Sequence, residues 1–282
     1  GFFQEPRQPY RIVKETAVSA LIDGGNNVGM LAIHHATQEA IARATRHGFA
    51  IICLSNSWMS GRSAHYCEMM ARAGLVGIHT VSAHPLVAPF GGAARVLGTN
   101  PIAFGFPCES DPLVIDMGTS AFMGTDLQFR ERMGTPIPEG VALDPQGRPT
   151  TDAGEGQRGA LLPFGGPEGG YKGFGLALAM EALGVLCASA RAPDDIRGYM
   201  IIAFKPDLFI PLEDYRRDLA QRIAAIKASP KLEGVDEIRI PGERSYRTRD
   251  RLRREGIEID RKIYDALGRL AEGQHNHGAG PA

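Results

Sequence analysis

Short apolar runs alternate with segments of helical periodicity along most of the chain. Apolar residues flanked by turn residues predict strands at 17–23, 49–54, 76–81, 102–106, 113–115 and 200–204. Apolar residues that recur at helical spacing predict helices at 30–47, 64–73, 176–186 and 212–228. This order of elements favours an α/β fold around a largely parallel or mixed sheet.

The stretch from Gly98 to Ser120 is predicted to form two adjacent buried strands that end at a ligand site. A turn leads into the run at 102–106, and a polar turn separates it from the run at 113–115. The second run stops at a carboxylate, a glycine and two hydroxyl groups, within Asp116, Met117, Gly118, Thr119 and Ser120. Ligands gather at strand ends because backbone groups lose their ladder partners there. We therefore expect a site at 116–120.

Two glycine-rich segments precede predicted helices. The first, 24–29, lacks the GxGxxG spacing of a dinucleotide-binding turn, and a plain strand–turn–helix unit is the preferred interpretation. The second, 165–175, includes Lys172 and precedes a strongly apolar helix. Its glycines either let the backbone approach an anionic ligand at the helix N-terminus or form a flexible loop that leads into a buried helix. The local sequence supports both interpretations equally.

Segments richer in glycine, proline or charge are predicted to lie at the surface. They are an extended N-terminal arm at 1–16 and a turn-rich excursion at 134–152, followed by a solvated arginine-rich helix face at 244–254 and a disordered tail at 271–282. A short strand followed by a turn is predicted at 238–242. None of these segments is assigned a ligand from its own residues.

The composition is that of an ordinary globular protein. The 282 residues are 43% hydrophobic and 22% charged, which suits one large domain or two lobes. A formal net charge of −1 excludes a general electrostatic attraction to nucleic acid or to anionic membranes. No apolar run approaches the roughly 18 residues of a membrane span, so we expect a cytoplasmic protein. The four cysteines lie far apart without a CxxC pair, which indicates reduced thiols and no disulfide framework or metal site.

Six blocks of sequence, in collinear order, resemble the malate/L-lactate dehydrogenase family. This family comprises non-Rossmann NAD(P)-dependent oxidoreductases, among them sulfolactate and ureidoglycolate dehydrogenases. The matching blocks include VAPFGGAARVLGTNPIAFGFP, PLVIDMGTSAF and the YKGFGLALAMEAL segment, and together they span 87–107, 112–122, 134–152, 159–183, 200–209 and 241–260. The resemblance therefore covers nearly the whole chain.

The resemblance implies a three-layer α/β/α arrangement around a mixed sheet that binds a dinucleotide without the usual fingerprint. It also implies a second, smaller lobe, built from both chain ends, that packs in a dimer. We accordingly expect a cofactor-binding domain at 76–209 and a dimerisation lobe formed by 1–75 and 210–270. A homodimer is expected on this ground alone.

The resemblance also implies that NAD or NADP binds along the stretch identified above. The implied cofactor-binding residues are Asp116, Met117, Gly118, Thr119, Ser120, Tyr171 and Lys172, with Gly242, Glu243 and Arg244 as weaker candidates. The residue types suit that role. A carboxylate can bond a ribose or an amide, hydroxyl groups can donate to a phosphate or carboxamide, and Lys172 can neutralise a phosphate.

Reduction of a 2-oxo acid needs two further groups, a cation for the substrate carboxylate and a proton donor for the forming alkoxide. In the family the donor is a histidine of an N-terminal Ser-His-Gly motif, which this chain lacks. A second family histidine maps to Met59. Gly61 and Arg62, which follow in the same loop, are expected to contact the substrate. The histidine often found before the family's lysine is Tyr171 here.

The retained histidines do not obviously replace the missing ones. His65 begins a predicted helix beside Arg62, and His79 and His84 flank a strand end near the expected cleft. Of these, His65 and His84 are the candidates for contact with substrate.

Two functional hypotheses follow. The first is an NAD(P)-dependent dehydrogenase of a small 2-hydroxy or 2-oxo acid, whose proton donor lies in residues before Gly1 of a longer natural protein. The second is a catalytically impaired, N-terminally truncated relative that binds a dinucleotide or serves as an assembly protein. A soluble α/β domain with no retained site is the third interpretation. An upstream Ser-His-Gly segment in the reading frame would favour the first.

Overall fold

The fold is described from a computed structural model, which covers residues 7–187 and 198–271. It divides into two compact units, 1–241 and 242–282. The first residues of the predicted N-terminal arm and the predicted tail beyond position 271 lie outside the described residues. Each unit is therefore considered by itself.

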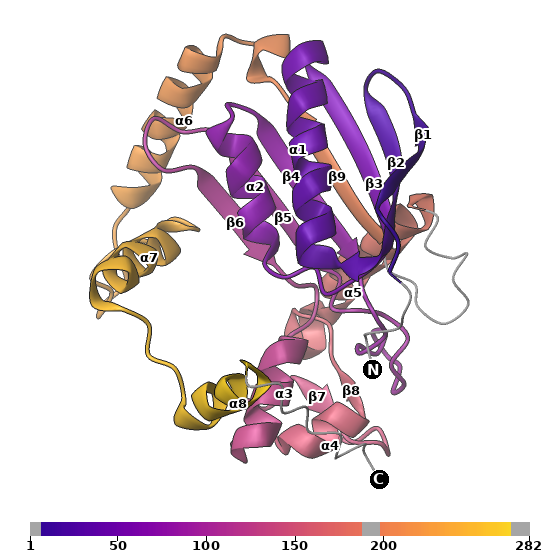
Figure 1. The fold of residues 1–282 in the computed structure, drawn as a ribbon. Helices are drawn as coiled ribbons and strands as arrows, with labels where there is room; N and C mark the ends of the chain where they lie inside the picture. Colours follow the sequence, from indigo (N-terminus) through magenta and orange to yellow (C-terminus); the bar gives the residue numbers. More distant parts are fainter. Residues whose placement is uncertain (1–6, 188–197, 272–282) are drawn as a thin grey trace. The chain divides into compact units, whose positions relative to one another are not determined.

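A seven-stranded mixed sheet forms the centre of the first unit (Figure 1). Its strand order is β1-β2-β3-β9-β4-β5-β6, with β2 and β3 parallel and every other neighbouring pair antiparallel. The strands are β1 (Arg11–Glu15), β2 (Ser19–Val28), β3 (Phe49–Trp58), β4 (Val76–Ser82), β5 (Ile102–Phe106), β6 (Leu113–Met117) and β9 (Gly198–Phe204). The two strands predicted within 98–120 are confirmed as neighbours, since β5 pairs with β6 from Ile102↔Met117 to Phe106↔Leu113.

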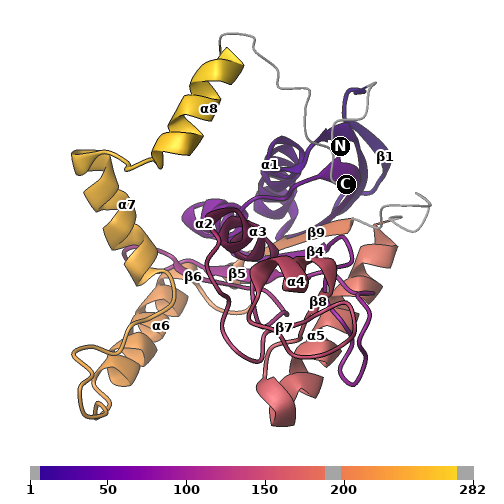
Figure 2. The ribbon, with the colours of Figure 1, turned by 90° about the horizontal axis from the view of Figure 1, so that it is seen from below.

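Helices cover both faces of this sheet (Figure 2). Helices α1 (Gly29–His47) and α2 (Ser63–Arg72) pack on one face, and α5 (Gly166–Leu186) packs on the other against β4 and β9. Buried aliphatic side chains such as Ile33, Ile52 and Ile201 fill the space between the sheet and the first helix layer. The predicted α/β fold with a mixed sheet is confirmed.

A second, smaller core lies outside the large sheet. It involves α3 (Gly124–Met133), α4 (Ala153–Arg158) and the two-stranded sheet β7 (Ala142–Leu143) with β8 (Ala160–Leu161). Its buried members are Val87, Leu97, Leu127, Ile137, Val141, Ala142, Ala153, Leu161 and Ala177. The prediction of a surface excursion at 134–152 is thus wrong in its middle, because 141–144 is buried beneath these helices.

Several element boundaries differ from the sequence expectation for local reasons. The glycine-rich 24–29 segment is mostly a continuation of β2, which runs to Val28 with an irregularity in its pairing between Asp23 and Asn27. The glycine-rich 165–175 segment is not a loop, because α5 begins at Gly166 after Gly165 turns with φ 112°. Proline near the first helical position favours this early start.

Most of the described residues after β9 are helical. The first unit ends with the 3₁₀ turn η2 (Pro206–Leu208) and α6 (Leu212–Lys227), whereas the strand predicted at 238–242 does not form. The second unit contains α7 (Glu243–Glu255) and α8 (Arg261–Ala271), and α8 was not predicted. The lobe boundaries at 75/76 and 209/210 stay a prediction, and the large sheet takes strands from both sides of position 75.

Candidate functional site

The carboxylate of Asp116 lies at the end of β6 and meets the start of α2. Its Oδ2 accepts a hydrogen bond of 2.7 Å from the backbone N–H of Ala64, and Arg62 lies within electrostatic range. Desolvation raises the pKa of Asp116 above its usual value, while the Ala64 N–H and the Arg62 guanidinium act to lower it. A carboxylate at a helix N-terminus is favourable. Asp116 therefore connects the expected cofactor edge to Arg62, one of the expected substrate residues.

The two hydroxyl groups of the 116–120 segment are already engaged by the protein. Thr119 Oγ1 donates to the Thr99 carbonyl at 3.1 Å, and Ser120 Oγ donates to the Phe122 carbonyl at 2.7 Å. Both residues are buried, whereas 40% of Met117 is exposed. A ligand at this edge would first meet Met117, and the hydroxyl groups could donate a hydrogen bond to it only by leaving their carbonyl acceptors.

The N-terminal half of α5 approaches this edge very closely. The Phe164 N–H donates to the Thr119 carbonyl at 3.0 Å, directly before α5. A Cβ on Gly173 would lie 2.4 Å from the Phe164 carbonyl oxygen and 3.1 Å from that of Thr119, so only glycine allows this packing. The structure thereby brings together the two halves of the expected cofactor site, the 116–120 segment and the helix that carries Tyr171.

Tyr171 and Lys172 present an aromatic ring and a cation to solvent at this place. Tyr171 is 54% exposed, and its ring stands edge-on to that of Phe90 with centroids 6.4 Å apart. The Lys172 ammonium lies 5.8 Å from the Tyr171 ring centroid. An aromatic face beside a positive charge suits an anionic, ring-containing ligand.

A network that joins a buried amide to a half-buried carboxylate behind this edge was missed by the sequence analysis. Asn100, fully buried at φ 35°, accepts from the Ala83 N–H at 2.9 Å and donates to Glu181 Oε1 at 2.8 Å. The second oxygen of Glu181 accepts from the Ser82 hydroxyl at 2.8 Å. The network joins β4, the turn before β5 and α5. The available signal was Glu181 itself, the single charged residue within the apolar 176–186 segment.

The turn between β3 and α2 holds the expected substrate residues. Met59 and Gly61 adopt left-handed backbone conformations with φ 60° and 70°, and Gly61 and Arg62 are exposed. A Cβ on Gly61 would lie 2.6 Å from Met30 Cγ, so the turn passes close over the start of α1. The hydroxyl of the buried Tyr66 donates to the Ser60 carbonyl at 2.6 Å. No local pattern in the sequence predicts this contact.

The histidines occupy three different environments. His65 is exposed on α2 and stacks on His34 of α1, with centroids 6.0 Å apart, and His84 is exposed two residues after β4 ends. His79 does not flank a strand end as expected. It lies within β4, is fully buried, and burial lowers its pKa to about 3. His79 is therefore neutral at physiological pH and has no access to substrate.

The weaker candidates Gly242, Glu243 and Arg244 begin the second compact unit. Gly242 caps α7 with φ 97°, and Glu243 forms an ion pair with Arg247 at 3.7 Å. Their part in a cofactor site stays a prediction. No group of three or more histidine, cysteine, aspartate or glutamate side chains in the described ranges is placed to hold a metal ion. None of the described helices is long and apolar enough to cross a bilayer.

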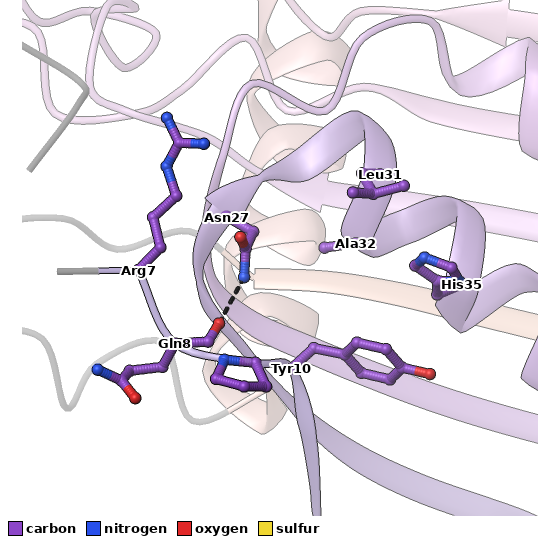
Figure 3. Close-up of a pocket in the computed structure, with 8 residues that line it drawn as sticks. Arg7, Gln8, Tyr10, Asn27, Leu31, Ala32 and His35 are labelled. Atoms are coloured by element: carbon purple, nitrogen blue, oxygen red, sulfur yellow. Dashed lines mark hydrogen bonds between the residues drawn. The ribbon is translucent and has the colours of Figure 1, made fainter. Parts of the chain in front are cut away.

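A pocket of about 370 Å³ lies between the N-terminal arm and α1 (Figure 3). Asn27 donates to the Gln8 carbonyl at 2.7 Å on one side, and the rings of Tyr10 and His35 stack with centroids 5.2 Å apart on the other. None of the residues expected to bind cofactor or substrate lines it; its lining consists of Arg7, Gln8, Pro9, Tyr10, Asn27, Leu31, Ala32 and His35.

Comparison with known proteins places these features in one family. The family described as malate/L-lactate dehydrogenase matches residues 3–268. The L-sulfolactate dehydrogenase of Methanocaldococcus jannaschii is 35% identical over 272 residues, covering 93% of this chain and 77% of its own. The ureidoglycolate dehydrogenase (NAD(+)) of Escherichia coli O157:H7 is 33% identical over 281 residues, covering 95% and 78%. The solved structure of malate dehydrogenase from Pyrococcus horikoshii OT3 superposes with a TM-score of 0.84 at 31% identity, covering 96% and 78%.

Proposed function

The chain belongs to the malate/L-lactate dehydrogenase family, and we propose that it transfers a hydride between a nicotinamide dinucleotide and a small 2-hydroxy or 2-oxo acid. The observation that carries this proposal is the continuous family match over residues 3–268, which includes every element that builds the candidate site. Relatives named for sulfolactate, malate and ureidoglycolate act on small hydroxy acids, and the same substrate class is proposed here.

The cofactor would lie along the edge formed by 116–120 and the first turns of α5. The chemistry of the exposed groups fits an anionic dinucleotide, because Lys172 offers a positive charge and Tyr171 an aromatic face beside the exposed Met117. Bound there, NAD or NADP would supply or accept the hydride. The choice between the two is part of the test below.

The substrate would lie beside the turn that precedes α2. We assign Arg62 to the substrate carboxylate, because it is exposed at the turn and lies near Asp116 of the cofactor edge. His65, one helical turn further on and also exposed, is the described histidine nearest in sequence to Arg62 and is the candidate proton donor among these residues. His84, exposed after β4, is the second candidate.

The experiment is a hydride-transfer assay of the full chain with NADH and NADPH against a panel of small 2-oxo acids, combined with calorimetry of dinucleotide binding. Lys172→Gln is expected to weaken dinucleotide binding about tenfold, since it removes one charge-assisted contact. Lys14→Gln, on the exposed strand β1, is the matched control and should leave binding unchanged. Absence of both binding and turnover would refute the proposal, and binding without turnover would favour a catalytically impaired relative. A homodimer is proposed from the family resemblance and is tested by light scattering. A cytoplasmic location is proposed from the sequence and is tested by cell fractionation.

A further inference from the structure

The turn that carries Gly61 and Arg62 has an unfavourable backbone. Asn56, Met59 and Gly61 all adopt left-handed conformations, with φ of 53°, 60° and 70°. For a methionine this region is sterically costly, and such conformations persist only where the surrounding structure holds them. Because 54% of Met59 is exposed, its own side chain provides little of that support.

Two buried phenol groups hold this segment from inside the core. The Tyr66 hydroxyl of α2 donates to the Ser60 carbonyl at 2.6 Å, and the Tyr199 hydroxyl of β9 donates to the Ser57 carbonyl at 3.4 Å. Each tyrosine is only 2% exposed. The two bonds therefore fix the segment at two points, Ser57 and Ser60, on either side of Met59.

His79 fills the space between the two phenols. Its ring centroid lies 5.1 Å from that of Tyr66 and 6.4 Å from that of Tyr199, with the Tyr199 ring almost parallel at 3°. Neither of its ring nitrogens has a hydrogen-bond partner among the residues that the structure describes. Its contribution is thus to packing, since a ring wedged between two others keeps both phenols from turning away from the carbonyls that they bind.

We propose that Tyr66 and Tyr199 are positioning residues that hold the 57–62 segment in the conformation that binds substrate. This inference rests on the proposed function, in which Arg62 binds the substrate carboxylate. Arg62 follows Gly61 directly and precedes the first residue of α2, so its position depends on the turn's backbone. Tyr66 makes the shorter hydrogen bond, so its hydroxyl contributes more than that of Tyr199 to holding the segment in place.

The test compares Tyr66→Phe and Tyr199→Phe with wild type in the full chain. Removal of the Tyr66 hydroxyl is expected to raise KM for the 2-oxo acid about tenfold, because one lost hydrogen bond corresponds to about that factor. The Kd for the dinucleotide should stay nearly the same, because α2 meets the cofactor edge through the Ala64 N–H, and the Tyr66 hydroxyl donates to Ser60 rather than to that edge. Tyr199→Phe should raise KM by less, about two- to threefold, in keeping with its longer bond. Tyr264→Phe, a 60% exposed phenol of α8, is the control.

Trp58 gives a second readout that requires no turnover. It is the only tryptophan of the chain, ends β3 beside Met59, and is 7% exposed. Loosening of the segment in Tyr66→Phe should expose Trp58 to water and therefore shift its emission to longer wavelength. Acrylamide quenching of Trp58 should increase about twofold or more for the same reason. This measurement separates the two proposals, because an inactive wild type would refute the function while Trp58 would still report on the phenol contacts.

Unchanged Trp58 quenching in Tyr66→Phe would overturn the inference. An equal loss of dinucleotide affinity and substrate affinity would also overturn it, because such a loss indicates general damage to the fold. If Tyr66→Phe does not fold, Tyr199→Phe provides the same two measurements with the smaller expected change. A rise in KM or in quenching that is specific to the two buried phenols supports the inference.

Discussion

The two edges of the candidate site are stabilised in different ways. The cofactor edge, 116–120 with α5, is held by backbone hydrogen bonds such as Phe164 N–H to Thr119 and by the hydrogen bond from the buried Asn100 to Glu181. The substrate turn, 57–62, begins in β3, where Ser57 and Trp58 pair with β2, and is held at two carbonyls by phenol hydroxyls that reach it from α2 and β9. Besides these contacts, the hydroxyl groups of Ser57 and Ser63 are buried without a hydrogen-bond partner among the described residues.

This difference makes the cofactor edge rigid and the substrate turn adjustable. Displacing α5 would break several short bonds and a glycine packing contact at once, so the cofactor edge has one favourable geometry. The substrate turn leaves the β2–β3 ladder after Trp58, and beyond that point its backbone has unfavourable angles and is held by the Tyr66 hydroxyl, so small changes beneath it can move Arg62. A family whose relatives are named for different hydroxy acids is consistent with a constant cofactor edge beside a substrate turn that varies.

The largest expected effect comes from filling the contact between α5 and the cofactor edge. Gly173→Ala places a methyl group against backbone atoms of Phe164 and Thr119, which cannot move as flexible side chains do. We expect it to lower the free energy of unfolding by about 3 kcal/mol, at the upper end for overpacking, and to abolish measurable dinucleotide binding. Thermal unfolding and calorimetry check both results.

The same helix offers a matched control. Gly175 is exposed and a Cβ there has no heavy atom within 4 Å, so Gly175→Ala should raise the unfolding free energy by about 0.5–1 kcal/mol through helix propensity. If both alanines stabilise the protein and leave binding intact, the close approach at Gly173 is not what defines the cofactor edge.

The second prediction concerns the pH dependence caused by His79. In the folded state burial lowers its pKa to about 3, whereas in the unfolded chain it returns to about 6.5. Between these values the unfolded state binds a proton that the folded state does not, so stability falls as the pH is lowered through this window. The slope is at most about 1.4 kcal/mol per pH unit.

His79→Phe isolates this effect. The phenylalanine ring fills a similar space without unpaired nitrogens, so stability at pH 7 should be equal or higher. The difference between wild type and variant, measured by chemical denaturation from pH 7 to pH 4, should grow steadily as the pH falls. A difference that does not change with pH would contradict a neutral, buried His79.

Features that depend on local sequence could be predicted, whereas contacts between residues far apart in the chain could not. The two strands within 98–120 were predictable because apolar runs and turn residues are local signals. The early start of α5 was not, since glycines disfavour helices locally and Gly173 is present for a contact with a segment about fifty residues away. The Asn100–Glu181 and Tyr199–Ser57 contacts join residues far apart in the chain, and no spacing rule indicates them.

The third prediction perturbs the network behind the cofactor edge. In Asn100→Asp the amide donor to Glu181 is lost and a second carboxylate faces the first. We expect a loss of about 2 kcal/mol of unfolding free energy, because the buried Ala177 carbonyl and the Glu181 carboxylate both lose the Asn100 amide donor and two carboxylates then repel each other. The double variant Asn100→Asp, Glu181→Gln restores a donor across the pair and should recover part of that loss. Additive losses in the double-mutant cycle would show that the two side chains do not depend on each other.

The smallest expected effect comes from relaxing the substrate turn itself. Met59→Gly removes the strain of a left-handed methionine, worth about 1 kcal/mol, but glycine also adds about as much conformational entropy to the unfolded chain. The unfolding free energy should therefore change by less than about 0.5 kcal/mol. Leu178→Gly, at an exposed position in the interior of α5, should instead cost about 1 kcal/mol. Equal losses at both positions, measured by thermal unfolding, would mean that the Met59 backbone is not strained, and the contrast between a fixed edge and a strained turn would then rest on the phenol contacts alone.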